Sequence, residues 1–435
     1  MKFEYPITSS YIRDWSLLDA LREFGANALD AETRTGNKAI ITYDAARKRL
    51  LFKNAGVTVS RDALLLGGTE NANRNDTIGT YGEGMKMGFL VVARLGLSIV
   101  VRNGTEEKWV PTISFSEKWS AKVLQLDVTK AVRQVASFEI EIMGIEMETW
   151  EALKGLFLRL QPATNSIALP SGNLLADSEL VGKVFCRGVF VMSRANFSYG
   201  YDFNNLTLNR DRKFTESIDA HMTKLWDELI LQNPEKLDEL YALLDRVTAE
   251  GSSMKYGVSH DVSARLAKTF REKFPNAYLA ANTQEVEKFK HYGVDAVVVG
   301  STLYWVLTGH VDTLDVFLKS NRYNVDKTYS LLDLSDTEVQ TFNQALRLLN
   351  AIGVVKSDEL RVSIVDFVDP AVKGVHEDSD VKISRSILSS FGKTVTYLVH
   401  EFAHDKGEDG EKAHMDALQD GLSAALDYLS RTFTV

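Results

Sequence analysis

A short stretch near the start of the sequence spaces two carboxylates and one carboxamide in a pattern suited to binding a metal ion and a water molecule. Asn27 and Asp30 follow Glu23 at offsets of four and seven residues, so a helix would carry all three side chains on one face. A carboxylate beside a carboxamide can polarise water and hold a divalent cation. The alternative is a solvated polar stripe without chemistry, and these three residues alone do not decide between the two.

A glycine-rich segment further along the chain has the composition of a phosphate-binding loop. Gly79, Gly82 and Gly84 precede an apolar stretch that contains Lys86 and is typical of a buried helix. Glycines at a helix N-terminus expose backbone N–H groups at the positive end of the helix dipole, where anions bind. The segment is not a Walker A loop, G-x-x-x-x-G-K. If Gly79 and Gly84 are the two glycines of that pattern, Met85 stands where the lysine must be. The alternative is a flexible surface loop.

A third group, Asn54-Ala55-Gly56, ends a predicted strand, and a turn there would let the backbone approach a flat ligand. Taken in order, the three groups resemble the GHKL ATPase family, which includes gyrase-type topoisomerases, a major heat-shock chaperone, histidine kinases and MutL. Residues 21–31 look like the family's first motif, E-x-x-x-N-A-x-D-A, and residues 54–58 stand where the family has D-x-G-x-G. The glycines at 79, 82 and 84 match its G-x-x-G-x-G lid motif. The resemblance covers about residues 10–145.

The resemblance implies that ATP and Mg²⁺ are cofactors, with Glu23 as general base for the attacking water and Asn27 as the magnesium ligand. Two positions depart from the family pattern. Asn54 replaces the aspartate that accepts from the adenine amino group, and a neutral acceptor is weaker than a charged one; Thr58 replaces the second glycine. Ser137 stands about where the family keeps a threonine near the adenine. The residues expected to bind nucleotide are Asn27, Asp30, Asn54, Gly56, Gly79, Gly82, Gly84, Lys86 and Ser137.

The family also implies a second domain that sends a basic side chain to the terminal phosphate. Residues 161–250 are placed for that role, and the loop at residues 209–213, Asn-Arg-Asp-Arg-Lys, is the best basic candidate. A locally paired charge cluster is the alternative. Because family members dimerise when ATP closes the lid, a homodimer formed on ATP binding is expected.

The C-terminal region carries a second possible chemistry, because residues 400–404 read His-Glu-Phe-Ala-His and fit H-E-x-x-H. An apolar stretch that is expected to be helical precedes them. His400 and His404 would therefore lie one turn apart on one face and could bind one zinc ion. Glu401 would then be placed to hold a water molecule and act as base.

A third zinc ligand is needed, and His414 is the nearest histidine, with Asp405, Glu408 and Asp409 as weaker alternatives. Residues 381–385 are interpreted as an exposed edge strand before the helix. This arrangement, over roughly residues 355–425, resembles the zincin metallopeptidases, in which such a strand aligns an extended peptide or protein substrate. A structural helix without metal and a zinc-bound but inactive fold both remain open. The histidines at 221, 260, 291, 310 and 376 are interpreted as isolated.

The elements that must position these residues alternate between helix and strand. Helices are predicted over residues 15–31 and 85–95, and strands over 39–43, 49–53, 97–102, 108–115, 123–128, 137–142, 184–191, 362–367 and 381–387. Strand, helix, strand and helix are expected in turn from residue 278 to residue 307. The predicted fold class is α/β (α+β), with a mixed sheet covered on one face at the N-terminus. The domains expected are a GHKL sandwich (1–160), a transducer-like domain (161–250), a small α/β connector (251–325) and a zincin-like domain (326–435).

Composition limits the function classes. The 435 residues include 50 basic and 59 acidic side chains, for a net charge of −9, which argues against binding to nucleic acid through bulk charge. Cys186 is the only cysteine, so a disulfide framework and a thiolate-rich zinc site are excluded. No signal-peptide core or membrane-spanning stretch is evident, and a cytoplasmic protein is predicted.

The sequence thus predicts a GHKL-type ATPase whose nucleotide-driven closure regulates a zinc-dependent, peptidase-like module. One rival is a non-catalytic interaction protein that ATP switches between conformations and that holds a structural zinc. Another is a DNA-associated GHKL remodeller, which the acidic balance disfavours.

Overall fold

The structure is a computed structural model that describes residues 1–65, 77–78, 83–134, 136–207, 217–246, 248–255, 257–355, 362–377 and 380–432. It divides into two compact units, the first formed by Met1–Leu266 with Gly300–Val306 and the second by Ala267–Val299 with Leu307–Val435. Gly79, Gly82 and the basic loop at 209–213 lie outside the described residues. Among the helices that are described, none combines the length and the apolar character needed to cross a membrane.

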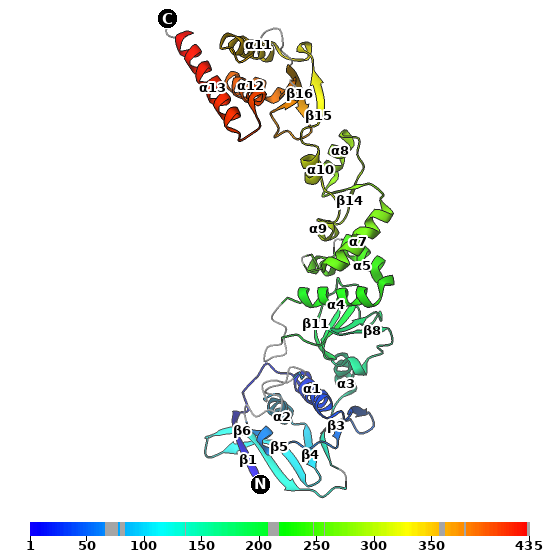
Figure 1. The fold of residues 1–435 in the computed structure, drawn as a ribbon. Helices are drawn as coiled ribbons and strands as arrows, with labels where there is room; N and C mark the ends of the chain where they lie inside the picture. Colours follow the sequence, from blue (N-terminus) through cyan, green and yellow to red (C-terminus); the bar gives the residue numbers. More distant parts are fainter. Residues whose placement is uncertain are drawn as a thin grey trace. The chain divides into compact units, whose positions relative to one another are not determined.

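The first unit begins with a seven-stranded sheet in the order β1-β6-β5-β4-β7-β3-β2 (Figure 1). Its strands are β1 (Lys2–Thr8), β2 (Ala39–Asp44), β3 (Arg49–Ala55), β4 (Ser98–Gly104), β5 (Glu107–Ser116), β6 (Ala121–Lys130) and β7 (Ser137–Met143). Every neighbouring pair is antiparallel, so the prediction of a mixed sheet is wrong here. Short turns join β2 to β3, β4 to β5 and β5 to β6, and such turns can connect only antiparallel strands.

Two predicted helices, α1 (Leu17–Thr35) and α2 (Gly84–Arg94), pack on one face of this sheet, and α3 (Met147–Gly155) follows it (Figure 1). A capping box between Ser16 and Asp19 starts α1, and Gly36 ends it in the left-handed conformation. The helices approach closely at Gly88, where an added Cβ would lie 2.6 Å from the Phe24 ring. This contact fixes α2 beside the face of α1 that carries the candidate site.

A five-stranded sheet comes next in the chain, in the order β11-β10-β12-β9-β8. Its strands are β8 (Ser166–Leu169), β9 (Gly172–Leu175), β10 (Lys183–Cys186), β11 (Val189–Ser193) and β12 (Gly200–Phe203). The single strand predicted over 184–191 is instead the hairpin β10–β11, because Arg187 and Gly188 both have positive φ and reverse the chain. Helices α4 (Asp219–Gln232), α5 (Leu237–Asp245), α6 (Ala249–Ser253), α7 (His260–Lys273) and α9 (Ser301–Leu307) complete this part of the chain.

The second unit holds two further sheets. The parallel pair β13 (Tyr278–Ala280) and β14 (Ala296–Val298) is joined by α8 (Thr283–His291), which confirms the predicted strand–helix–strand order, and α10 (Leu314–Ser320) follows. The last sheet has the order β15-β16-β18-β17. Its strands are β15 (Val325–Tyr329), β16 (Val362–Phe367), β17 (Gly374–Glu377) and β18 (Asp380–Ser384), and its helices are α11 (Asp336–Ala351), α12 (Phe391–Ala403) and α13 (Lys412–Thr432).

This last sheet corrects two predictions about residues 381–387. The strand ends at Ser384, and Arg385–Ser389 forms a short 3₁₀ helix instead. The segment is also not an edge strand, because β18 pairs with β16 on one side and with β17 on the other. The edge belongs to β17, a four-residue strand that sequence reasoning did not predict.

Candidate nucleotide and metal sites

The predicted polar face of α1 is largely buried rather than solvated. Glu23 is 2% exposed and Asp30 is 1% exposed, while Asn27 between them is partly exposed. Buried carboxylates are uncommon unless a partner or a function keeps them. The alternative of a solvated polar stripe therefore does not fit Glu23 or Asp30.

Glu23 lies directly against the start of α2. A Cβ built on Gly84 would come within 2.1 Å of Glu23 Oε2, so only glycine leaves room for the carboxylate. Gly84 is the first residue of α2, where unpaired N–H groups and the helix dipole attract negative charge. Two segments that lie far apart in the sequence thus meet at this point.

Asp30 contacts the chain just before the glycine segment. Its Oδ1 accepts a hydrogen bond of 2.6 Å from the backbone N–H of Ile78. Residues 79–82, which include Gly79 and Gly82, follow Ile78 and lie outside the described residues. Asp30 is therefore an anchor for the start of the predicted phosphate loop.

Asn54 and Ser137 lie on opposite faces of the sheet and do not form one site. The Asn54 carboxamide is 2% exposed and donates from Nδ2 to Ala28 O of α1 at 2.9 Å. Ser137 pairs in register with Ala55, the neighbour of Asn54, and alternate residues of a strand point to opposite faces. Ser137 Oγ instead donates to Glu139 at 2.9 Å. Strand parity thus separates Ser137 from the residues that face α1.

Gly56 and Lys86 complete the set of predicted nucleotide residues that the structure describes. Gly56 has a φ of +69° and donates its N–H to Ala136 O at 2.9 Å, which ends β3 in a tight turn. Lys86, in the first turn of α2, is 1% exposed. Burial lowers the pKa of Lys86 to about 8, although the nearby Glu83 raises it.

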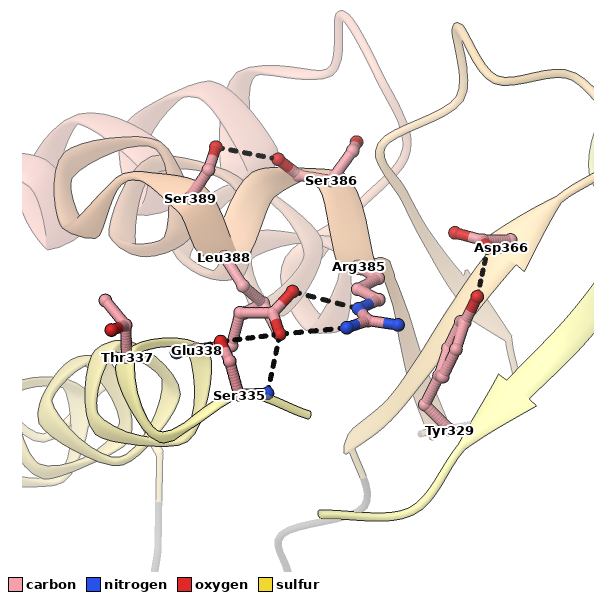
Figure 2. Close-up of a pocket in the computed structure, with 9 residues that line it drawn as sticks. All are labelled: Tyr329, Ser335, Thr337, Glu338, Asp366, Arg385, Ser386, Leu388 and Ser389. Carbon is pink, nitrogen blue, oxygen red and sulfur yellow. Dashed lines mark hydrogen bonds and ion pairs between the residues drawn. The ribbon is translucent and has the colours of Figure 1, made fainter. Parts of the chain in front are cut away.

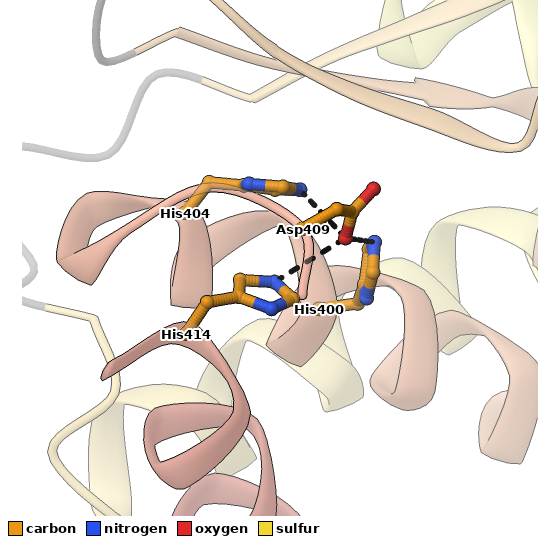
Figure 3. A group of neighbouring side chains, drawn as sticks. All are labelled: His400, His404, Asp409 and His414. Carbon is orange, nitrogen blue, oxygen red and sulfur yellow. Dashed lines mark ion pairs between the residues drawn. The ribbon is translucent and has the colours of Figure 1, made fainter. Parts of the chain in front are cut away.

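The C-terminal histidines come together as predicted. His400 and His404 lie one turn apart at the end of α12, and His414 at the start of α13 faces them (Figure 3). Asp409, from the turn between the helices, joins the group, and the four ligand atoms all lie within 4.8 Å of one another. Its Oδ1 is 3.6 Å from His400 Nε2 and 3.8 Å from Nε2 of both His404 and His414.

His414 argues against the alternative of a structural helix without metal. Its side chain is 1% exposed, and neither ring nitrogen makes a hydrogen bond within the described residues. A buried polar atom without a partner is costly, and most such atoms in proteins are satisfied. A divalent metal ion between the imidazoles would satisfy one of these nitrogens, so the donor set fits zinc.

Glu401 and His400 have pKa values shifted by their surroundings. Glu401 is 4% exposed, and burial and then the charge of Asp409 raise its pKa to about 7. Its carboxylate is packed against β17, because a Cβ on Gly374 would lie 2.3 Å from Glu401 Oε1. Burial also lowers the pKa of His400, against the opposing effect of Asp409.

Sequence reasoning missed His376, which it interpreted as isolated. This residue lies on the edge strand β17, and its Nε2 is 2.9 Å from Asp405 Oδ1. Its ring is stacked on that of His404, with 6.1 Å between the ring centroids. No local spacing relates His376 to the H-E-x-x-H motif, so only the sheet pairing could have shown the contact.

An open pocket of about 710 Å³ in the same unit contains none of the four clustered residues. It is lined by Tyr329, Ser335, Thr337, Glu338, Asp366, Arg385, Ser386, Leu388 and Ser389 (Figure 2). Arg385 donates to both carboxylate oxygens of Glu338 at 2.9 and 3.0 Å, and this pairing lowers the pKa of Glu338 to about 2. The charged side chains that line it are thus already partnered.

Comparison with known proteins gives little further guidance. The sequence matches no protein-family model. It is 25% identical over 217 residues to an uncharacterized protein of Mycoplasma pneumoniae, covering 47% of this chain and 87% of that one. The structure overlaps two crystal structures of the ATPase region of Saccharomyces cerevisiae topoisomerase II, the second bound to ICRF-187 (dexrazoxane), at TM-scores of 0.29 and 0.28 and 9% identity. These overlaps span 40% of this chain and only 62% of the ATPase region, and similarity at this level assigns neither fold nor activity.

Proposed function

We propose that the first unit binds Mg·ATP in the manner of the GHKL ATPases and hydrolyses it. The observation that carries this proposal is the contact between Glu23 of α1 and Gly84 at the start of α2. It brings a buried carboxylate to the helix N-terminus that the glycine motif precedes, which is where a phosphate would bind. A surface loop beside an unrelated helix would not need this contact.

Each residue of the proposed nucleotide site has a distinct task. Glu23 would take the proton from the attacking water, and Asn27, partly exposed one turn later, would offer its amide oxygen to Mg²⁺. Asn54 donates through Nδ2 to Ala28, so its Oδ1 is the atom left to accept from an adenine amino group. Lys86 would supply a positive charge near the phosphates, and an anion beside it would raise its lowered pKa again.

Calorimetry with a non-hydrolysable ATP analogue tests this half of the proposal. Binding that strengthens when Mg²⁺ is present, and that Asn27→Ala reduces only in the presence of Mg²⁺, is the expected result. Absence of binding with and without Mg²⁺ would remove the nucleotide site from the proposal.

We further propose that the second unit is a zinc-dependent hydrolase module that acts on an extended peptide. The observation that carries it is the buried His414, whose unbonded ring nitrogens face His400 and His404. Three neutral imidazoles form a common ligand set of catalytic zinc sites. When bound, zinc would act as a Lewis acid and make a water molecule easier to deprotonate.

The chain's own residues would then position substrate and proton. Glu401 follows the first ligand directly and would accept the proton of the attacking water. Within the part of the chain that the structure describes, strand β17 pairs on one side only, and an extended peptide could pair with its other edge as an added strand. The substrate-aligning strand that the sequence placed at residues 381–385 is therefore proposed at Gly374–Glu377 instead.

Metal analysis and a peptidase assay test this half separately. Purified protein should hold one zinc per chain and should cleave an unfolded protein substrate, and Glu401→Gln should abolish cleavage while retaining zinc. Zinc without cleavage would favour the rival interpretation of an ATP-switched interaction protein with a structural zinc.

Coupling between the two sites is the last part of the proposal. Closure around ATP, with dimerisation of two chains, would regulate the zinc module. Cleavage rates measured with and without the ATP analogue, together with the molar mass in each state, test this step. Rates and mass that do not respond to nucleotide would leave two independent sites.

A further inference from the structure

The turn that connects the two metal-binding helices carries a carboxylate at a specific place in the histidine cluster. Asp409 Oδ1 lies at nearly equal distances, 3.6, 3.8 and 3.8 Å, from Nε2 of the three histidines. In a tetrahedral zinc site with Zn–N bonds of 2.0–2.1 Å, the ligand atoms are about 3.3 Å apart. The Asp409 oxygen is therefore within about 0.5 Å of the separation expected between a fourth ligand atom and each imidazole nitrogen.

That corner is the one a hydrolytic zinc site must keep open. Catalytic zinc has three protein ligands and leaves the fourth position to water or substrate, whereas structural zinc has all four positions filled by protein. Three histidines alone would give the open arrangement, and adding Asp409 gives the closed one. With Asp409 the cluster offers four ligand atoms, the number that a closed centre needs.

Asp409 differs from the histidines in how it is held. Its side chain is 73% exposed, whereas the side chains of His404 and His414 are 15% and 1% exposed. Asp409 lies between η6 (His404–Lys406) and α13, and Gly410, which follows it, has a φ of +85°. Because it sits in a short exposed turn, the carboxylate can leave the cluster without disturbing the buried imidazoles.

We propose that Asp409 is an exchangeable fourth zinc ligand that closes the metal centre and is displaced by the substrate or an anionic ligand. The inference rests on the zinc centre proposed above and adds a regulatory element to it. The resting centre is closed and inactive, and its activity depends on how readily the turn moves away.

Cobalt substitution in the full-length protein tests this directly, because the visible spectrum of Co²⁺ reports its coordination without requiring turnover. Wild-type protein should show the intense bands of a four-coordinate centre, and acetohydroxamate should change them only at high concentration. In Asp409→Ala, acetohydroxamate should change the spectrum at low concentration. Competition with a chelator should show zinc bound at least about 10-fold more weakly, because even the loss of a group outside the ligand shell costs 10–100-fold. Asp409→Asn, which keeps the shape but not the charge, should fall between the two.

Asp416→Ala is the matched control, because Asp416 is an exposed carboxylate on α13 just after His414 but outside the cluster. It should behave as wild type. Peptide cleavage should rise in Asp409→Ala, which a purely structural ligand would not produce. Equal zinc affinity and equal hydroxamate response in wild type and Asp409→Ala would overturn the inference while leaving the zinc centre intact. Failure of the wild-type protein to bind Zn²⁺ or Co²⁺ would overturn the zinc centre itself.

Discussion

The two candidate sites differ in how far apart their residues lie in the sequence. The candidate metal cluster draws all its members from residues 400–414, on two helices joined by one turn. The nucleotide site draws on α1, the end of β3 and the start of α2, which only the packed sheet brings together. A site made from one helix turn and one loop can be predicted from spacing, whereas a site made across a sheet depends on strand pairing and on which face each residue occupies.

The largest expected effect concerns the candidate metal cluster, whose residues are close together in the sequence. His404→Ala removes one of three imidazoles, and zinc affinity should fall by more than about 100-fold, because changes outside the ligand shell alone cost 10–100-fold. Zinc retained after gel filtration, measured by atomic spectroscopy, checks this. His260→Ala, an exposed histidine on α7, should retain its zinc. Retention of stoichiometric zinc by His404→Ala would show that spacing had misidentified the site.

The next effect concerns ATP hydrolysis at the proposed nucleotide site. Glu23→Gln keeps the size of the side chain but removes the base, so ATP turnover should fall by about 10²–10⁴-fold. The affinity for the non-hydrolysable analogue should stay near that of wild type. A coupled phosphate-release assay beside calorimetry separates the two quantities. Wild-type turnover in this variant would mean that another group takes the proton.

A smaller effect tests the contact between α1 and α2. Gly84→Ala would place a Cβ 2.1 Å from Glu23 Oε2, so the carboxylate or the helix must shift. Overpacking of this kind costs about 1–3 kcal/mol in the free energy of unfolding, and a urea titration would measure it. Gly155→Ala is the control, because that glycine lies in α3 with nothing within 4 Å of its added Cβ. Its stability should be unchanged or slightly raised.

The smallest effect tests on which face of the sheet the nucleotide binds. Asn54→Ala should weaken binding of the ATP analogue by about 0.5–1.5 kcal/mol, the net contribution of a hydrogen bond between neutral groups. Ser137→Ala should leave that affinity unchanged, because Ser137 bonds to Glu139 on the opposite face. Calorimetry on the two variants gives the comparison. If Ser137→Ala weakens binding as much as Asn54→Ala does, the nucleotide does not lie on the α1 side of the sheet.

Sequence patterns predicted α1, α2 and the strands β2 to β7 well, because each depends on local periodicity and on end signals, but they did not predict β1, β8, β9 or β12. The helix predicted over 15–31 continues to Thr35, where Gly36 provides the left-handed cap. Periodicity could not show that the sheet is antiparallel throughout, since strand direction follows from the connections between strands. It also merged β10 and β11, since apolar residues stand on both sides of the turn at Arg187 and Gly188.

The metal cluster was predicted more completely than its surroundings. Helical spacing placed His400 and His404 together, and the shortness of the following turn brought in His414. Asp409 was only one of three alternatives, because a loop side chain has no periodicity that fixes its direction. The contact of His376 with Asp405 depends on the edge strand β17, whose four residues are too few to give a pattern.

In the zinc module proposed above, the absence of a side chain at residue 374 would bear on which peptide bond is cleaved. Because Glu401 is packed directly onto this position, the strand and the carboxylate are held in a fixed register. An extended chain advances about 3.3 Å per residue. A peptide paired with the edge of β17 would therefore place its amide bonds at regular distances from Glu401. On the same proposal, a bulkier residue at 374 would shift the strand relative to Glu401, and the bond that is cleaved would change to a neighbouring one.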